Sequence, residues 1–288
     1  MVRKAVIPAA GFGTRFLPAT KSQPKEMLPV VDKPTIQYVV EEAVRSGVRD
    51  ILMVIGKAKR AIEEHFDRSF ELERELEEKG RLHELKTIRA ISSMANIHFV
   101  WQKELRGLGD AVLHAREHVG QEPFAVLLGD TIIESKTPVT RQLIEVYNRY
   151  QEPVVALEEV EMSRVSRYGV INGKPINGGQ YLISDFVEKP APSKAPSNLA
   201  IAGRYVFTAE VFDHLRRTKP GKNGEIQLTD AMRLMAAKRA MYGLRFDGRR
   251  HDIGNKVDFI KTNILFGLQR EDMRKDLAAF VKAVAREL

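Results

Sequence analysis

The chain has 288 residues, a net charge of +8, 43% hydrophobic residues and no cysteine. This length is enough for one large α/β domain, or for two small ones, with an ample core. The lack of cysteine excludes a disulfide framework, a thiolate nucleophile and a thiolate metal site, and it fits a reducing cytoplasm.

The positive charge is spread along the chain. Basic residues alternate with acidic ones, as in Glu63-Glu64-His65-Phe66-Asp67-Arg68, and are not massed on one segment. We therefore expect no nucleic-acid partner. We also expect no membrane span, because no apolar run of the sequence approaches ~20 residues. Near the N-terminus, Pro8 interrupts the apolar residues after Arg3-Lys4, which favours a strand and loop over a signal peptide.

The first half of the chain alternates short apolar runs with helix-like runs. Strands are predicted over residues 2–8, 51–55, 97–101 and 124–128, and helices over 34–46 and 108–119. This alternation is typical of an α/β fold with right-handed crossovers and helices on both faces of the sheet. We therefore predict a Rossmann-like, mixed and mainly parallel sheet flanked by helices. Its ligands should lie beyond the carboxyl ends of the strands.

The second half of the chain is less regular. Strands are predicted over residues 154–160, 181–187 and 200–207, with a hairpin turn at Gly178-Gly179 and a last helical tract over 255–286. Residues 67–95 interrupt the alternation with a charged helical insertion, which we expect to be solvated or, second, to contact a neighbouring subunit. The two halves are interleaved without a linker, so we predict one domain over residues 1–288.

A glycine loop follows the first strand directly, with the sequence Ala9-Ala10-Gly11-Phe12-Gly13-Thr14-Arg15. Glycines on such a turn let the backbone approach an anion, and their N–H groups can point at phosphate oxygens. Arg15 and Lys25 add two cations. A dinucleotide fingerprint needs a third glycine or alanine where Phe16 stands, and a Walker loop needs Gly-Lys-Ser/Thr. The loop therefore predicts a polyphosphate site and disfavours an oxidoreductase.

The loop and the segment Lys25-Glu26-Met27-Leu28-Pro29 together resemble the sugar-nucleotide pyrophosphorylases, which carry Gly-x-Gly-Thr-Arg and then Lys-x-x-Leu-Pro. The fuller string from Leu17 to Pro29 is similar to their bacterial branch that transfers a uridylyl group from UTP to glucose 1-phosphate. The resemblance covers residues 3–267 and implies the fold type of nucleotide-diphospho-sugar transferases. It implies nucleotide contacts from Ala9, Ala10, Gly11, Gly13, Thr14, Arg15, Glu26, Gln102 and Gly107.

Asp130 follows the apolar run of residues 124–128 and Gly129, so it should lie at the same sheet edge as the glycine loop. Carboxylate oxygens suit Mg²⁺ beside phosphates, whereas a cap of the next turn is the alternative interpretation. The resemblance implies the metal role for Asp130 and adds Asp252, which alone reads equally as a helix N-cap. Mg²⁺ is therefore the expected cofactor.

Base and sugar contacts are implied by further motifs. A glutamine amide offers a donor and an acceptor side by side, complementary to N3–H and O4 of uracil. The resemblance implies this role for Gln102, with a backbone contact at Gly107. It implies that Glu188 holds sugar hydroxyls and Lys189 the sugar phosphate, although the pair alone reads as a surface ion pair. Sugar contacts are also implied for Gly169 and for Gly203, which fits a packing role equally.

The implied reaction is a Mg²⁺-assisted in-line attack of the sugar phosphate on the α-phosphorus of UTP, giving UDP-glucose and pyrophosphate. Arg15, Lys25, Asp130 and Lys189 are the expected catalytic residues. No nucleophilic side chain is required, because a phosphate monoester is largely dianionic at neutral pH. The alternatives are a sister pyrophosphorylase using dTTP or another sugar 1-phosphate, and a non-catalytic sugar-nucleotide sensor. The resemblance also implies a homo-oligomer, a dimer or a tetramer.

Overall fold

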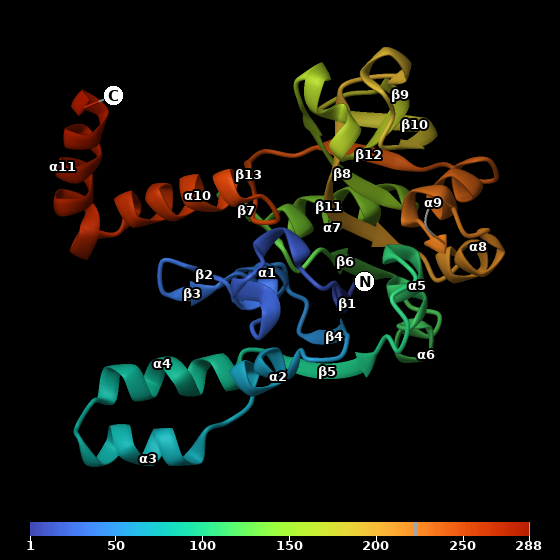
Figure 1. Cartoon of the computed structure of the whole chain (residues 1–288). Helices are drawn as coiled ribbons and strands as arrows, with labels where there is room; N and C mark the ends of the chain where they lie inside the picture. The colour runs from blue at the N-terminus through green and yellow to red at the C-terminus, as the bar shows by residue number, and fades with distance from the viewer. Residues whose placement is uncertain (222–223, 288) are drawn as a thin grey trace.

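The structure is a computed structural model, and it describes residues 1–221 and 224–287. Within these residues a nine-stranded sheet runs through both halves of the chain (Figure 1). In their order across the sheet the strands are β5 (Asn96–Trp101), β4 (Asp50–Ile55), β1 (Lys4–Ala9), β6 (Phe124–Leu127), β11 (Leu199–Phe207), β8 (Val154–Glu159), β12 (Tyr242–Arg245), β10 (Gln180–Glu188) and β9 (Gly169–Pro175). Among these described strands, seven run in one direction, and β10 and β11 run against them. The predicted mixed, mainly parallel sheet is confirmed.

Helices cover both faces of this sheet because its central strands, such as β1, β4, β6 and β11, are apolar on both sides. In β1, Ile7 packs in one hydrophobic cluster and its neighbour Val6 in the other, as alternating strand side chains must. The first cluster is covered by α1 (Thr35–Arg45), α2 (Arg60–Phe66) and α7 (Val139–Tyr150). The second is covered by α5 (Leu108–Leu113), α6 (Arg116–Val119), α8 (Val211–Arg217) and α9 (Leu228–Ala236).

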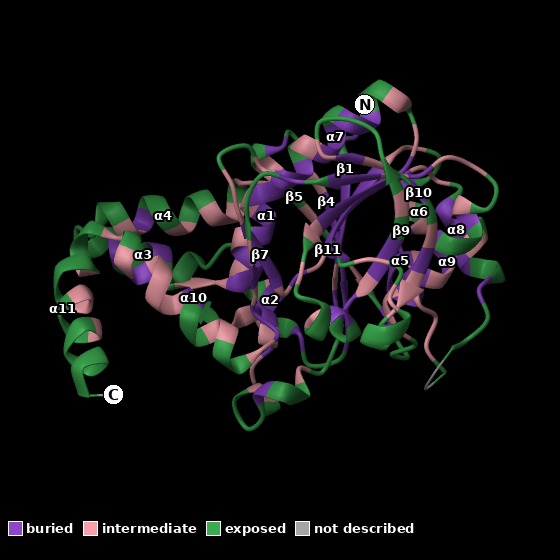
Figure 2. Cartoon of the chain, turned by 90° about the horizontal axis from the view of Figure 1, so that it is seen from above, coloured by how far each residue is buried: buried purple, intermediate pink, exposed green. Residues whose placement is uncertain are grey.

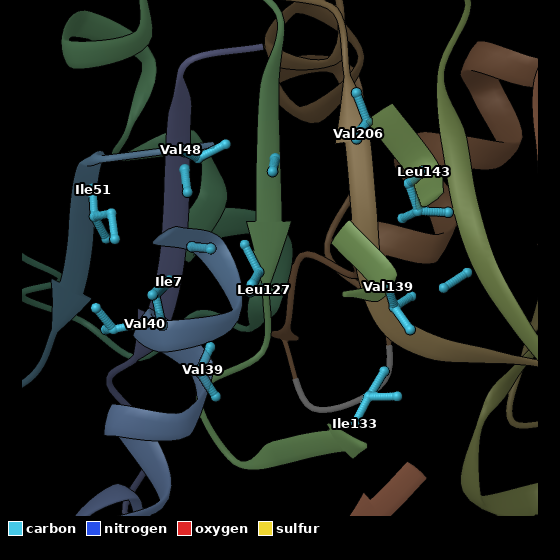
Figure 3. Packing of buried hydrophobic residues seen from close by; sticks show 14 of the residues in the cluster. Ile7, Val39, Val40, Val48, Ile51, Leu127, Ile133, Val139, Leu143 and Val206 are labelled. Atoms are coloured by element: carbon cyan, nitrogen blue, oxygen red, sulfur yellow. The ribbon is translucent and has the colours of Figure 1, made fainter. Parts of the chain in front are cut away.

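Helix α1 shows why the sequence folds this way locally. Its apolar residues Ile36, Val39, Val40 and Ala43 recur at helical spacing, and all four are fully buried. Figure 3 shows Val39 and Val40 in one cluster with Ile7 of β1 and Leu127 of β6, and with side chains of α7. The helix predicted over residues 108–119 is broken into α5 and α6 by a turn at His114-Ala115.

Two helical pairs project from this core. The insertion forms α3 (Phe70–Glu78) and α4 (Leu82–Ser93), and the last tract forms α10 (Lys256–Gln269) and α11 (Glu271–Glu287), which are separated at Arg270. Figure 2 shows both pairs largely exposed and to one side of the buried sheet. Helix α11 has no buried residue among those described. Among the described helices, none combines the length and the apolar character that crossing a bilayer requires.

Two small antiparallel ladders sit at the carboxyl edge of the main sheet. One joins β2 (Pro29–Val30) to β3 (Lys33–Pro34), and the other joins β7 (Thr131–Glu134) to β13 (Arg249–Asp252). The register of the second ladder pairs Asp252 with Thr131. Two carboxylates more than a hundred residues apart, Asp130 and Asp252, are thereby brought to one place. The predicted hairpin turn at Gly178-Gly179 joins β9 to β10, with φ values of 54° and 78°.

Candidate active site

A cavity of about 680 Å³ opens at the carboxyl edge of the sheet. The predicted site residues that line it are Ala10, Gly11, Gly13, Thr14, Lys25, Glu26, Gln102, Gly107, Asp130, Gly169, Glu188 and Lys189. They come from widely separated parts of the chain, so the fold has gathered them around one space.

The remaining predicted residues lie beside the cavity rather than on its wall. Ala9 ends β1 behind the glycine loop and is 1% exposed. Gly203 has φ 77°, and a Cβ there would lie 2.9 Å from Leu128 Cδ1, a side chain that itself lines the cavity. This contact supports the packing interpretation of Gly203 over a direct sugar contact. Arg15 and Asp252 belong to a group of charges at the rim of the cavity.

The glycine loop adopts a conformation that only its glycines allow. Gly13 has φ 67°, and a Cβ there would lie 2.9 Å from Lys25 Cβ. Its carbonyl accepts hydrogen bonds from the backbone N–H of Phe16 at 3.0 Å and from Thr20 Oγ1 at 2.8 Å. A single 3-10 turn over Thr14–Phe16 follows, in place of the long helix of a dinucleotide fold.

Lys25 and Asp130 form an ion pair at the centre of the cavity, with 2.5 Å between Lys25 Nζ and Asp130 Oδ2. Burial alone lowers the pKa of Lys25, but the carboxylates of Asp130 and Glu26 outweigh it and leave that pKa raised. Burial alone raises the pKa of Asp130, yet Lys25 and Arg15 hold it below its ordinary value. Both groups are therefore charged at neutral pH.

Glu26 is held by a lysine from outside its own motif. Lys59 Nζ donates to Glu26 Oε2 at 2.8 Å and to the Gly11 carbonyl at 2.7 Å. The exposed fractions are 1% for Glu26 and 5% for Lys59. Burial raises the pKa of Glu26, and the two lysines offset only part of that rise. Lys59 thus links the glycine loop, through Gly11, to the segment of residues 25–29, through Glu26.

Asp130, Asp252 and Arg15 converge on Gly254. A Cβ on Gly254 would lie 3.2 Å from Asp252 Oδ1, 3.6 Å from Asp130 Oδ2 and 3.7 Å from Arg15 Nη1. Asp252 is also tied by two hydrogen bonds, from Gly254 N at 3.1 Å and from Tyr168 Oη at 3.4 Å. The missing side chain of Gly254 keeps room between two carboxylates, which is the donor chemistry that a hard divalent cation takes.

The far wall of the cavity carries a second ion pair. Lys189 Nζ lies 2.8 Å from Glu188 Oε1, and Thr229 Oγ1 donates to Glu188 Oε2 at 2.7 Å. A Cβ on Gly169 would lie 3.2 Å from the same Glu188 oxygen, so the glycine leaves that carboxylate accessible. Lys25 and Lys189 both line the cavity, and each is thus paired with a carboxylate there.

The predicted base-reading segment lies at the end of β5. Gln102 is 4% exposed, and its Nε2 donates to Asp110 Oδ2 at 2.7 Å and to the Gly107 carbonyl at 3.2 Å. Gly107 has φ 96°, and a Cβ there would lie 2.8 Å from the Ile226 carbonyl oxygen. Only glycine fits this position without moving the backbone of Ile226.

A family model described as nucleotidyl transferase matches residues 4–266. The chain belongs to the nucleotidyl transferase family. This nucleotidyl transferase is 52% identical, over 281 residues, to the UTP–glucose-1-phosphate uridylyltransferase of Staphylococcus epidermidis, with 98% of each chain covered. The family indicated by the glycine loop and by residues 25–29 is confirmed, and the oxidoreductase alternative is excluded.

Two solved structures are similar to this nucleotidyl transferase throughout. A UDP-glucose pyrophosphorylase complexed with UDP-glucose is 44% identical, with a TM-score of 0.87, and covers 94% of this chain and 100% of its own. A UTP-bound UGPase from Acinetobacter baumannii is 38% identical, with a TM-score of 0.90, and covers 98% of this chain and 99% of its own. The predicted fold type is confirmed by this similarity.

Sequence reasoning missed several residues of this nucleotidyl transferase's site. Lys59 lies on no recognised motif, and only the folded chain brings it to Glu26. Asp110 belongs to no quoted motif and stands in the first turn of α5, where an acid is ordinary. Thr229 lies at the start of α9, on a segment that had been assigned no element. Of these, Asp110 carried a local signal, since it stands three residues after Gly107.

Proposed function

We propose that this nucleotidyl transferase makes UDP-glucose and pyrophosphate from UTP and α-D-glucose 1-phosphate. The observation that carries the proposal is one cavity lined both by the glycine loop with Lys25 and Asp130 and by the pair Glu188 and Lys189. Two phosphate-bearing substrates need such cations in one cavity. The relatives named for UTP, glucose 1-phosphate and UDP-glucose support this choice of substrates.

The reaction needs positioning and charge neutralisation more than a chemical group from the protein. An oxygen of the sugar phosphate forms a bond to the α-phosphorus of UTP, and the bond from that phosphorus to the bridging oxygen breaks. Pyrophosphate leaves with that electron pair, opposite the attacking oxygen. Arg15 and Lys25 neutralise the departing pyrophosphate, and Lys189 holds the phosphate of the sugar. Glu188 accepts hydrogen bonds from the sugar hydroxyls.

Asp130 and Asp252 fit a divalent metal, and we propose Mg²⁺ as the ion that they hold. Their oxygens share the space above Gly254, and both carboxylates are hard ligands of the kind that Mg²⁺ prefers. When bound, Mg²⁺ supplies positive charge to the α-phosphate and its attacker. Chelation by EDTA should therefore abolish turnover, and added Mg²⁺ should restore it. Full activity in excess EDTA would contradict the metal assignment.

The base end of the cavity is proposed to read uracil. The sequence suggested that the Gln102 amide contacts both N3–H and O4, but its nitrogen is engaged by Asp110 and by the Gly107 carbonyl. Gln102 Oε1 would therefore accept N3–H of the base, and the backbone N–H of Gly107 would donate to O4. Gln102→Ala should raise the KM for UTP and relax the choice of base, while kcat changes little. Unchanged nucleotide preference in this variant would show that the base is read elsewhere.

The deciding experiment is pyrophosphate release with Mg²⁺ and glucose 1-phosphate, comparing UTP, dTTP, ATP, CTP and GTP. Release with UTP well above the others is expected. A preference for dTTP would keep the mechanism but move the chain to a thymidylyl-transferring branch, since one methyl group is typically discriminated by only ~1–3 kcal/mol. Release with none of the five, with Mg²⁺ in excess, would favour the sugar-nucleotide sensor.

We also propose that residues 1–288 form one domain, that the enzyme works in the cytoplasm where UTP is made, and that it forms a homo-oligomer. The nine-stranded sheet, which takes strands from both halves, supports the first point. The projecting pairs α3–α4 and α10–α11 support the last, because they expose large apolar side chains such as Phe70, Leu82 and Phe280. A monomeric mass in solution by light scattering would contradict the oligomer.

A further inference from the structure

The orientation of the Gln102 amide is fixed by Asp110, which is not among the residues that line the cavity. Asp110 is 8% exposed, and its Oδ2 lies 2.7 Å from Gln102 Nε2. A carboxylate only accepts hydrogen bonds, so the amide must turn its nitrogen toward Asp110. The second amide N–H is taken by the Gly107 carbonyl, which is also an acceptor only. If the amide were rotated by 180°, Gln102 Oε1 would face two oxygen atoms that are also acceptors, Asp110 Oδ2 and the Gly107 carbonyl.

This arrangement decides which atom of Gln102 the cavity receives. With both N–H groups engaged, Gln102 presents Oε1, which has no hydrogen-bond partner among the residues that the structure describes. The adjoining Gly107 has a positive φ of 96°, and we propose its backbone N–H as the donor for O4 of the base. The observed part of the pattern is the acceptor at Gln102 Oε1. Together with the proposed Gly107 N–H it makes an acceptor next to a donor, in a fixed order.

That order distinguishes the two kinds of pyrimidine. Uracil and thymine present N3–H and O4, a donor next to an acceptor, and they match the cavity. Cytosine presents the reverse, an unprotonated N3 and an amino group. An unpaired buried polar group costs far more than a weakened contact, so the wrong base is rejected.

We propose that Asp110 is a positioning residue that sets the base choice by locking the amide of Gln102. This inference rests on the proposed reading of the base by Gln102. Asp110 also stands in the first turn of α5, where an acid is favoured by the helix dipole. A purely structural role of that kind predicts a change in stability without a change in base preference, which separates the two roles.

The test is Asp110→Asn, which keeps the shape of the side chain but lets it face Gln102 with either an acceptor or a donor. We expect the ratio of kcat/KM for UTP to that for CTP to fall about tenfold or more. The amide of Gln102 could then rotate and donate to the unprotonated N3 of cytosine, which removes the mismatch that disfavours CTP. The KM for UTP should rise, while kcat at saturating UTP stays within about twofold of the wild type. Direct titration with UTP and CTP, without sugar phosphate, should show the same change in the dissociation constants.

Two matched variants make the result decisive. Glu117→Gln removes one negative charge from the neighbouring helix α6, on an exposed side chain, and should leave the ratio unchanged. Gln102→Ala tests the base reading itself. If Gln102→Ala changes the ratio and Asp110→Asn does not, the positioning role is wrong and the base reading stands. If neither changes it, both fail. Should Asp110→Asn not fold, the two dissociation constants of Asp110→Ser serve instead.

Discussion

A glutamate is paired with arginine in two regions of the molecule, beneath the carboxyl edge of the sheet and on the α3–α4 hairpin. The two regions differ in how far water reaches the arginines. Beneath the edge, Arg204 is 0% exposed, and its guanidinium forms a salt bridge with Glu42 at 2.8 Å. It also donates to the carbonyl oxygens of Thr131 at 2.7 Å and Leu128 at 3.5 Å. These two carbonyls flank the Gly129-Asp130 turn, so a buried ion pair holds the strand end that carries the proposed metal ligand.

On the hairpin, Glu73 accepts hydrogen bonds from Arg68 at 2.6 Å and from Arg89 at 2.8 Å. The two arginine side chains are 49% and 47% exposed, although the Glu73 side chain is only 4% exposed, so water and salt screen these contacts from the arginine side. Breaking a charge pair in the first region should therefore affect folding and catalysis together. Breaking one in the second should affect only local stability.

The largest effect is expected for Asp130→Asn, which removes a proposed metal ligand and the partner of Lys25. We expect kcat to fall by about 10³-fold or more, with the fold intact, because the loss concerns charge that acts mainly in the transition state. Initial rates and a thermal unfolding curve check this. Asp247→Asn, on an exposed loop, is the matched control. An active Asp130→Asn enzyme would remove the metal assignment.

Breaking the buried pair should come next. Arg204→Met leaves the Glu42 carboxylate buried without its partner, and such a change typically costs about 3–5 kcal/mol of unfolding free energy. Urea unfolding measures this, and kcat should fall as the Asp130 turn loosens. The double change Glu42→Leu with Arg204→Met should cost less than Arg204→Met alone. A double variant that is less stable than the single one would contradict the uncompensated-charge argument.

A smaller effect is expected for Lys59→Met, which leaves Glu26 and the Gly11 carbonyl without their shared donor. Leaving such acceptors unpaired costs about 1–3 kcal/mol. The KM for UTP should rise because the glycine loop loses its anchor. Lys57→Met, an exposed lysine two residues away, should change neither quantity. If the KM for UTP is the same in Lys59→Met and Lys57→Met, Lys59 has no role in nucleotide binding.

The smallest effect concerns Glu73 and depends on pH. Hydrogen bonds from Arg68 and Arg89 lower the pKa of Glu73 from 4.5 to about 2. A lowered folded-state pKa gives stability that is present above the unfolded value and is lost as the pH falls through the folded one. The melting temperature of the wild type should therefore exceed that of Glu73→Gln at pH 6, and the difference should shrink as the pH falls from 4.5 toward 2. A constant difference over that range would mean that the pair contributes no pH-dependent stability.

How far the sequence predicts this molecule differs between its parts. Strands β1, β4, β5 and β6 were predicted within one or two residues, because each contains a short apolar run, which in β1, β4 and β6 is buried on both faces. In the second half β9 and β12 were missed, and the strand presumed before Asp252, which is β13, was given no bounds. They carry charged or glycine residues in runs too short to show a period, and pairing with neighbours alone makes them strands.

The site shows the same division. The glycine loop and Lys25 belong to one continuous stretch, so their chemistry is visible in the chain itself. Asp252 reaches Asp130 only through the ladder of β13 with β7. Lys59 belongs to no motif, and Asp110 is marked only by its place three residues after Gly107. Their proposed roles follow from their buried contacts with Glu26 and Gln102.

By itself, the sequence determined the class of fold, the phosphate-binding loop and the family, since these depend on local patterns of apolar residues, glycines and cations. The tertiary structure alone decided which lysine holds Glu26, which carboxylate turns the amide of Gln102 and which glycine separates the two aspartates. Hydrogen bonds and burial act over a few ångströms in space, and such distances between residues far apart in the chain exist only once the sheet has formed.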